Sequence, residues 1–141
     1  HVLFYCEDIP QVLAECRRVL KDEGRFLCST YGKQHMWEIT DLVQKFHKEI
    51  VLSAEVLYER FGLENGENLL APYFPEIQMR RYEDAIEIAE AEPLISYILS
   101  CHGNQNQLLL NQYKEFREFV SARVADGFHI TKEAGIFLCR K

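Results

Sequence analysis

Cys101 and His102 are adjacent residues whose side chains could act as a nucleophile or as ligands of a metal ion. Structural zinc needs four correctly spaced ligands, however, and adjacent residues rarely converge on one ion. The pair is therefore interpreted as a core position followed by a polar loop, and no metal site is predicted. The five cysteines are odd in number and lack C-x-x-C spacing. This pattern favours free thiols in a reduced, cytoplasmic protein.

The composition restricts the class of partner. A length of 141 residues, 48% of them hydrophobic and 27% charged, is typical of one globular domain. The net charge of −6 argues against nucleic acid as the main partner, so Arg17-Arg18 and Arg80-Arg81 are interpreted as solvated faces. Charges interrupt every apolar run before the length of about 20 residues that a membrane span needs. No membrane partner and no signal peptide are predicted.

The first elements of the chain predict two-thirds of a β-α-β unit. Asp8 is a good N-cap residue, and Pro10 lies in the first turn, where a missing N–H does no harm. The helix that follows is expected to stop by Gly24. A continuous apolar run within 25–31 then indicates a buried strand. The apolar run HVLFYC (1–6) precedes the helix and is interpreted as the end of another strand.

Apolar spacing and turn residues define the remaining elements. The first of these are a long helix over 36–50, a shorter helix capped by Ser53, and a loop with one helical turn over 61–76. A strand over 77–83, a short extended piece over 85–90, a helix opened by Pro93 and a polar linker over 102–107 come next. The chain then continues with a helix over 109–124 and ends with strands over 128–131 and 136–140, joined by a turn at KEAG. This order predicts an α/β fold whose sheet is mainly parallel at first and antiparallel at its end.

Two stretches of the chain carry a resemblance to a known family. HVLFYCEDI (1–9) resembles the end of the fourth strand of class I S-adenosylmethionine-dependent methyltransferases of the bacterial type 11 kind. AECRRVLK (14–21) is similar to the family's helix that ends in R-V-L-K, although Asp22-Glu23-Gly24 stands where Pro-Gly-Gly is usual. Softer matches follow in the family's order, at FGLENG (61–66), RYED (81–84), EPLISYI (92–98) and GIFL (135–138).

The resemblance implies that the chain is the C-terminal half of a Rossmann-like domain. The family's Gly-rich turn and its ribose-binding acid precede the fourth strand, and no G-x-G run occurs in these residues. Residues 1–141 are thus expected to form a single partial domain, with a substrate-cover insertion at 47–76. In the family's sheet the last strand lies between the fifth and sixth. Segments 25–31, 77–83 and 136–140 are therefore expected to be neighbouring strands, the last one antiparallel.

The same resemblance implies contacts with the cofactor, S-adenosyl-L-methionine. His1, Phe4 and Tyr5 would line the site of its methionine end, where aromatic faces can stabilise a sulfonium cation. Two alternatives remain open, because Phe4 fits a core position equally and His1 fits a frayed terminus. The catalytic residue is not identified. His1 and His35 are the candidates for a general base.

Four residues are implied on the side of the methyl acceptor. Tyr31 and His35 flank a strand end, where ligands gather in open α/β sheets. Glu64 and Asn65 form the most polar part of an aromatic-rich segment, as substrate contacts or as a turn.

These features predict the acceptor-side portion of a methyltransferase that acts on a small molecule. The 141 residues alone are expected to be inactive and to self-associate through an uncovered sheet edge. The alternative is a non-catalytic interaction or dimerisation domain of α/β type.

Overall fold

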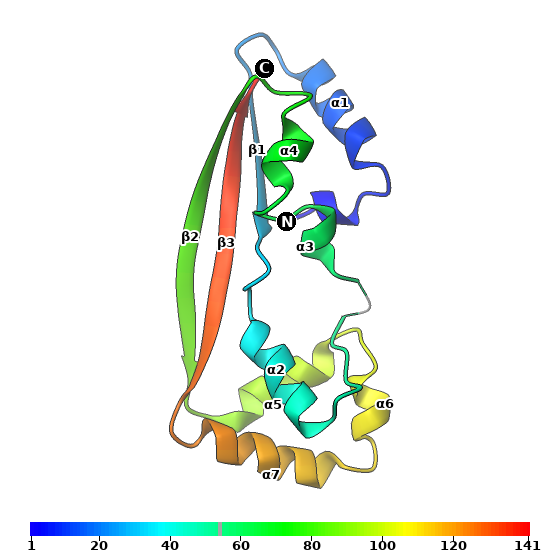
Figure 1. Ribbon diagram of the computed structural model, residues 1–141, viewed down its shortest axis with the longest axis vertical. Coiled ribbons are helices and arrows are strands. Elements are labelled where there is room, and N and C mark those ends of the chain that lie inside the picture. The colour runs from blue at the N-terminus through cyan, green and yellow to red at the C-terminus, as the bar shows by residue number, and fades with distance from the viewer. Residues whose placement is uncertain (54) are drawn as a thin grey trace. The chain divides into compact units, whose positions relative to one another are not determined.

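A computed structural model describes residues 1–53 and 55–141, which form two compact units (Figure 1). Unit 1 comprises His1–His35, Val56–Glu83 and Glu133–Lys141, and unit 2 comprises Met36–Glu55 and Asp84–Lys132. Two long strands, β2 (Glu76–Ile88) and β3 (Phe128–Arg140), each contribute residues to both units.

The sheet has the strand order β1-β3-β2, where β1 is Arg25–Tyr31. β1 pairs with β3 in antiparallel register, from Arg25 opposite Arg140 to Tyr31 opposite Ala134. The prediction that the three segments share one sheet, with the last segment antiparallel and in the middle, is confirmed. The prediction of a mainly parallel first part is wrong, because the neighbouring strands of the described sheet run antiparallel.

β3 is continuous where the sequence predicted a turn at KEAG. Gly135 lies opposite Thr30 within the β1–β3 ladder. A Cβ atom at Gly135 would be 2.7 Å from Leu63 Cδ2 and 2.9 Å from the Arg80 carbonyl oxygen. The glycine is therefore required by a close approach inside the sheet, and it does not mark a chain reversal. The extended piece predicted at 85–90 is likewise part of a longer strand, since β2 continues to Ile88.

The helical elements of unit 1 are η1 (Leu3–Tyr5), α1 (Ile9–Val19), α3 (Leu57–Arg60) and α4 (Gly66–Leu70). The predicted cap is confirmed, because the Asp8 carboxylate accepts a 2.9 Å hydrogen bond from Gln11 N–H. The predicted strand end at HVLFYC is wrong. These residues form a 3₁₀ turn in which Tyr5 N–H donates to the Val2 carbonyl at 2.9 Å, so local hydrogen bonds replace a sheet ladder.

One face of the sheet in unit 1 packs against α1 and α4. Figure 1 shows both helices on the same side of β1. The core lies between them and consists of Leu3, Phe4, Ile9, Leu13, Phe61, Leu63, Leu70, Phe74, Phe137 and Cys139. Phe26 of β1 stacks on Phe74 with ring centroids 5.3 Å apart. Burial of this apolar face is the main driving force for docking of the helices.

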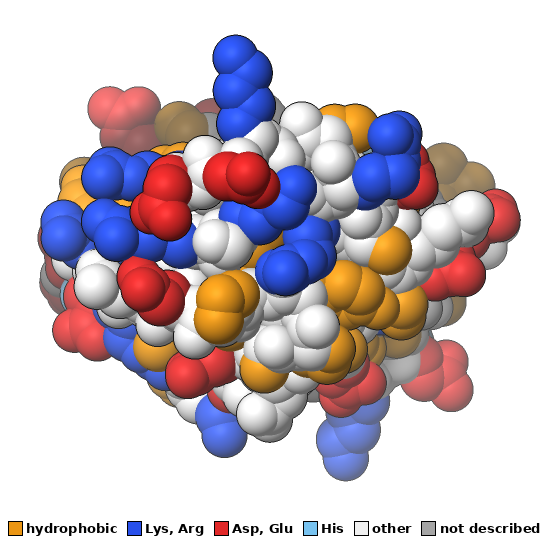
Figure 2. Space-filling model, turned by 90° about the horizontal axis from the view of Figure 1, so that it is seen from above, with side chains coloured by type: hydrophobic (Ala, Val, Ile, Leu, Met, Phe, Trp, Pro, Cys, Tyr) orange, Lys and Arg blue, Asp and Glu red, His pale blue; other side chains and the backbone are white. Residues whose placement is uncertain are grey.

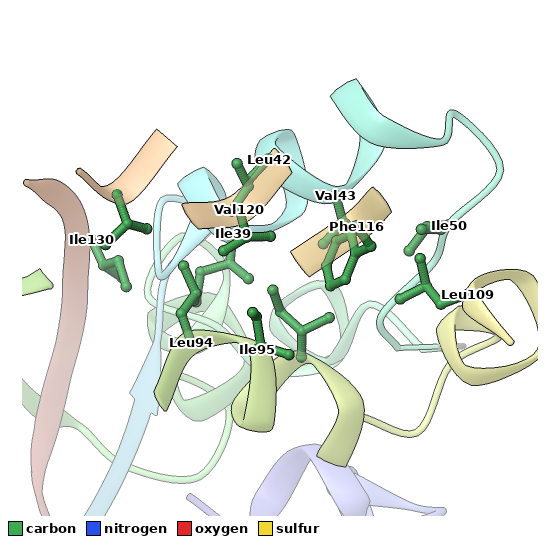
Figure 3. Packing of buried hydrophobic residues seen from close by; sticks show 12 residues of the cluster. Ile39, Leu42, Val43, Ile50, Leu94, Ile95, Leu109, Phe116, Val120 and Ile130 are labelled. Carbon is green, nitrogen blue, oxygen red and sulfur yellow. The ribbon is translucent and has the colours of Figure 1, made fainter. Parts of the chain in front are cut away.

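Unit 2 is mainly helical and contains α2 (Trp37–Phe46), α5 (Ala91–Ser100), α6 (Gln105–Leu109) and α7 (Tyr113–Val124). Its core side chains come from facing helices and from the start of β3 (Figure 3). They are Ile39, Leu42, Val43, Ile50, Leu94, Ile95, Ile98, Leu109, Phe116, Val120, Val124 and Ile130. The apolar spacing predicted most of this set, since it depends on local helical periodicity.

The predicted boundaries of unit 2 differ from the structure around Asn104. The helix predicted over 36–50 ends at Phe46. The Asn104 amide explains the difference, because its Oδ1 accepts from Val51 N–H and its Nδ2 donates to the Glu49 carbonyl, each at 2.8 Å. These bonds hold residues 49–51 in a non-helical conformation. The predicted linker 102–107 is helical from Gln105, and Ser53 hydrogen-bonds Glu55 instead of capping α3.

No helix among the described residues is both long enough and apolar enough to cross a membrane. Lys and Arg side chains lie beside Asp and Glu side chains over the face that Figure 2 shows.

His129 of β3 and Glu87 of β2 form an ion pair in unit 2 when the histidine is protonated. We therefore expect the stability of the protein to depend on pH. The hydrogen bond to the Glu87 carboxylate raises the pKa of His129 above its ordinary value of 6.5. A folded-state pKa above the unfolded one stabilises the fold at low pH, and this contribution is lost as the pH rises through the folded-state pKa. We expect the melting temperature of Glu87→Gln, relative to the parent, to be lowered at about pH 5.5 and hardly changed at about pH 8.5. Glu118→Gln, an exposed change on α7, is the control, and an equal deficit at both pH values would contradict the expectation.

Candidate functional site

Aromatic and imidazole rings form a cluster around Tyr31 at the C-terminal end of β1 in unit 1. The Tyr31 ring lies 6.1 Å from His1, 5.4 Å from Phe4 and 5.1 Å from His35, measured between ring centroids. Ser29 also holds the His1 ring, because its Oγ lies 2.7 Å from His1 Nδ1. The structure thus brings together four of the residues predicted from the sequence to line the site.

His35 is oriented by a backbone hydrogen bond. Its Nδ1 accepts from the Glu133 N–H at 3.1 Å. In the neutral ring the proton is therefore assigned to Nε2, which makes that atom a donor. This arrangement suits a residue that orients a ligand by donating a hydrogen bond. It does not suit a general base acting through Nε2, because that atom carries no lone pair in this tautomer.

Two carboxylates approach the turn that follows β1. Glu64 Oε1 accepts from Lys33 N–H at 3.1 Å, and Glu133 Oε2 accepts from Gln34 N–H at 3.0 Å. Both carboxylates lie against Gly32, where a Cβ atom would be 2.9 Å from Glu64 Oε1 and would clash with Glu133. Glycine at this position permits the approach of the two acids. Glu133 also pairs with Arg81, which leaves Glu64 as the acid without a described cation.

The loop after α3 is tied to the end of β1 by three successive hydrogen bonds. The buried Thr30 hydroxyl donates to the Phe61 carbonyl at 2.6 Å, and Leu63 N–H donates to the Tyr31 carbonyl at 3.3 Å. The Lys33–Glu64 bond is the third. Because the strand is part of the sheet, the loop is held in one position relative to it.

Asn65 sets the internal shape of this loop. Its Oδ1 accepts from Gly62 N–H and its Nδ2 donates to the Glu59 carbonyl, each at 2.7 Å. Both ends of the amide are therefore engaged by the backbone. This favours the turn interpretation of Asn65 over a role as a substrate contact.

A cavity of about 340 Å³ opens beside this loop in unit 1 and is lined by Lys33, Tyr58, Glu59, Glu64 and Asn65. Its volume is within the range of small-molecule sites, roughly 300–1,000 Å³. The sequence indicated Glu64 and Asn65 but missed Lys33 and Glu59. Their place in the cavity depends on hydrogen bonds between β1 and the loop, and such long-range contacts leave no local pattern in the sequence.

The residues predicted to contact a cofactor differ in exposure. Tyr5 is 65% exposed and packs edge-on against Phe4, with ring centroids 4.7 Å apart. Phe4 is only 2% exposed and belongs to the core of unit 1. Its burial favours the packing alternative, whereas Tyr5 and His1 can present their rings to a ligand.

The thiols of Cys28, Cys101 and Cys139 are poorly suited to nucleophilic chemistry. All five cysteines are free. Burial raises the pKa of Cys28 to about 12 and that of Cys139 to about 11, so both remain protonated near neutral pH. Burial also raises the pKa of Cys101, whose Sγ donates to the Tyr97 carbonyl. A structural role for the Cys101-His102 pair is consistent with this.

No protein-family model matches the chain, and no curated protein is significantly similar to it.

Proposed function

We propose that the chain is the acceptor-side, C-terminal portion of an S-adenosylmethionine-dependent methyltransferase that acts on a small molecule. The observation that carries the proposal is the strand order β1-β3-β2, with the last strand antiparallel between the other two. This is the order expected from the methyltransferase resemblance for the fifth, seventh and sixth strands. The cluster of rings around Tyr31 and the cavity lie at the C-terminal end of β1, where ligands gather in open α/β sheets.

The residues present fit part of a cofactor site. When bound, S-adenosylmethionine supplies an activated methyl group, and the protein's part is to align the reactants and to exclude water. The ring of Tyr5, which is exposed, and the ring of His1, which Ser29 holds, would contact the cofactor's methionine end. Phe4 would support Tyr5 from the core. His35 would orient the acceptor as a hydrogen-bond donor.

The test uses the protein as its gene encodes it, with any coding sequence upstream of His1. We expect calorimetric titration to show saturable S-adenosylmethionine binding by that protein and very weak or no binding by the 141 residues alone. Tyr5→Ala should weaken binding by roughly tenfold, through loss of one ring face at a cation. Its melting temperature should not change, because the side chain is largely exposed.

A variant of His35 tests the acceptor side of the proposal. His35→Asn retains an acceptor for the Glu133 N–H but removes the Nε2 donor, so it should lower methyl transfer while preserving stability. Equal losses of activity and melting temperature would assign Tyr5 and His35 to packing. Absence of cofactor binding in the gene's complete product would contradict the proposal.

A second candidate is a non-catalytic interaction domain, and the edge position of β1 favours it. Leu27 of this strand is 55% exposed, and an edge strand with exposed apolar side chains is a template for pairing with another chain. Analytical ultracentrifugation separates the two candidates. Self-association that persists in the complete gene product, without cofactor binding, would favour the interaction domain.

A further inference from the structure

We infer that the cavity lined by Lys33, Tyr58, Glu59, Glu64 and Asn65 binds a small organic amine in its ammonium form. The inference deepens the proposed function, and it rests on that function only in naming the amine as the methyl acceptor. The cavity itself lies wholly within unit 1.

The acidic side chains of the cavity are available to a ligand. Among the described residues, the Glu59 carboxylate forms no ion pair and no side-chain hydrogen bond. Glu64 uses Oε1 to accept from Lys33 N–H, and this bond fixes the carboxylate while leaving Oε2 for a ligand. The lining residues include two acids, Glu59 and Glu64, and one base, Lys33, so the net charge of the lining is negative and favours a cation.

The cavity also supplies an aromatic surface. Tyr58 belongs to α3, next to Glu59, and its side chain is half-buried. A ligand that carries both a cationic and an apolar part would place the cation near the acids and the apolar part on this ring. Both ends of the Asn65 amide already bond to the backbone of the loop, at Gly62 and Glu59. Specificity is therefore assigned to charge and to the ring, rather than to an amide.

The cavity is preorganised for binding. The Thr30 hydroxyl and the Lys33 N–H donate hydrogen bonds to the loop that carries Glu64, and the Tyr31 carbonyl accepts one from it. Asn65 fixes the backbone between Glu59 and Gly62. A ligand thus meets a loop whose backbone and whose Glu64 carboxylate are already held in place, which lowers the entropic cost of binding.

The experiment is a titration of the isotope-labelled 141 residues with benzylamine, followed by ¹H–¹⁵N NMR. Benzyl alcohol and benzoate are the matched probes, because they retain the ring and replace the ammonium by a neutral or an anionic group. We expect saturable shifts confined to residues 32–35 and 57–66 with benzylamine, and no saturable shift with benzoate. The inference would be overturned if benzyl alcohol or benzoate bound with the same affinity as benzylamine. It would also be overturned if benzylamine gave no saturable shift.

Charge-neutral variants test the assigned acids. Glu59→Gln combined with Glu64→Gln should weaken benzylamine binding by at least roughly tenfold, because charge-assisted hydrogen bonds are lost. Glu67→Gln, an exposed change on α4 outside the cavity lining, should leave binding unchanged. Tyr58→Leu provides a second variant. It retains both carboxylates but removes the aromatic ring, so benzylamine should bind more weakly. Unchanged affinity in both the glutamine and the leucine variants would overturn the assignment.

The outcome is separable from that of the proposed function. Benzylamine binding does not need the cofactor, so it can be measured on the 141 residues alone. If benzylamine binds at this cavity but the complete gene product does not bind S-adenosylmethionine, the amine site is supported and the methyltransferase proposal is contradicted. If the complete gene product binds the cofactor but benzylamine gives no response, the methyltransferase proposal is supported and the amine site is contradicted.

Discussion

Phe137→Ala is expected to destabilise unit 1 by about 3–5 kcal/mol, as large-to-small changes of a buried phenylalanine do. Phe137 lies on the central strand and is fully buried. Its ring packs edge-on against Phe61, with centroids 5.8 Å apart. A Cβ atom at Gly66 would be 2.6 Å from Phe137 Cε2, so the start of α4 packs directly on this ring. Removal of the ring leaves a cavity between the sheet and the loop that carries Glu64.

The measurement is denaturant unfolding of the parent and the variant, with Leu138→Ala as the matched control. Leu138 is the next residue of β3, opposite Leu27, and is only partly buried. Its replacement should cost clearly less than that of Phe137. Phe137→Leu should give an intermediate value, because it retains part of the volume. Equal effects of the Phe137 and Leu138 changes to alanine would show that the inner face of the sheet is not the stabilising one.

The helices were the most predictable part of the fold, because their signals are local. Apolar residues at three- and four-residue spacing identified α1, α5 and α7, and Asp8 identified the start of α1. The ends of α2 were less predictable. Its early stop depends on Asn104, which is distant in sequence and forms its bonds only after the chain has folded.

In the strands, glycine can mark a turn or allow a close approach of another segment, and the local sequence does not distinguish the two. Gly135 indicated a turn from the local sequence, but in the structure it allows Leu63 and the Arg80 backbone to approach β3. The strand order itself followed from the methyltransferase resemblance, not from the residues, since antiparallel and parallel neighbours differ in long-range pairing.

The candidate site was predictable where it depends on topology. Tyr31 ends β1 and His35 comes shortly after it, so the strand predicted over 25–31 implied their place at a strand end, and the structure places their rings 5.1 Å apart. The prediction that this strand is buried is wrong, because β1 lies at the edge of the sheet and Leu27 is 55% exposed. The role of Glu133 was hidden, because it lies within the predicted KEAG turn. Its carboxylate and backbone N–H reach the turn after β1 only through the pairing of β1 with β3.

Asn65 and Glu64 are neighbours that we expect to have opposite phenotypes. The Asn65 amide makes two hydrogen bonds to the backbone of its own loop, whereas Glu64 is exposed and has one carboxylate oxygen available. Glu64→Gln should therefore reduce amine binding at constant melting temperature. Asn65 variants should change stability first.

Asn65→Ala leaves the buried Gly62 N–H and the Glu59 carbonyl without their partners, each of which is 2.7 Å away in the parent. The unsatisfied Gly62 donor should cost roughly 1–3 kcal/mol, because a buried group carries its desolvation penalty, and loss of the bond to the exposed Glu59 should add less. The freed loop would no longer hold Glu59 and Glu64 at the cavity, so benzylamine binding should weaken in parallel with the loss of stability. Asn65→Asp, which retains the acceptor for Gly62 N–H, should lose less than half as much. A stable Asn65→Ala variant that fails to bind benzylamine would instead make Asn65 a direct ligand contact.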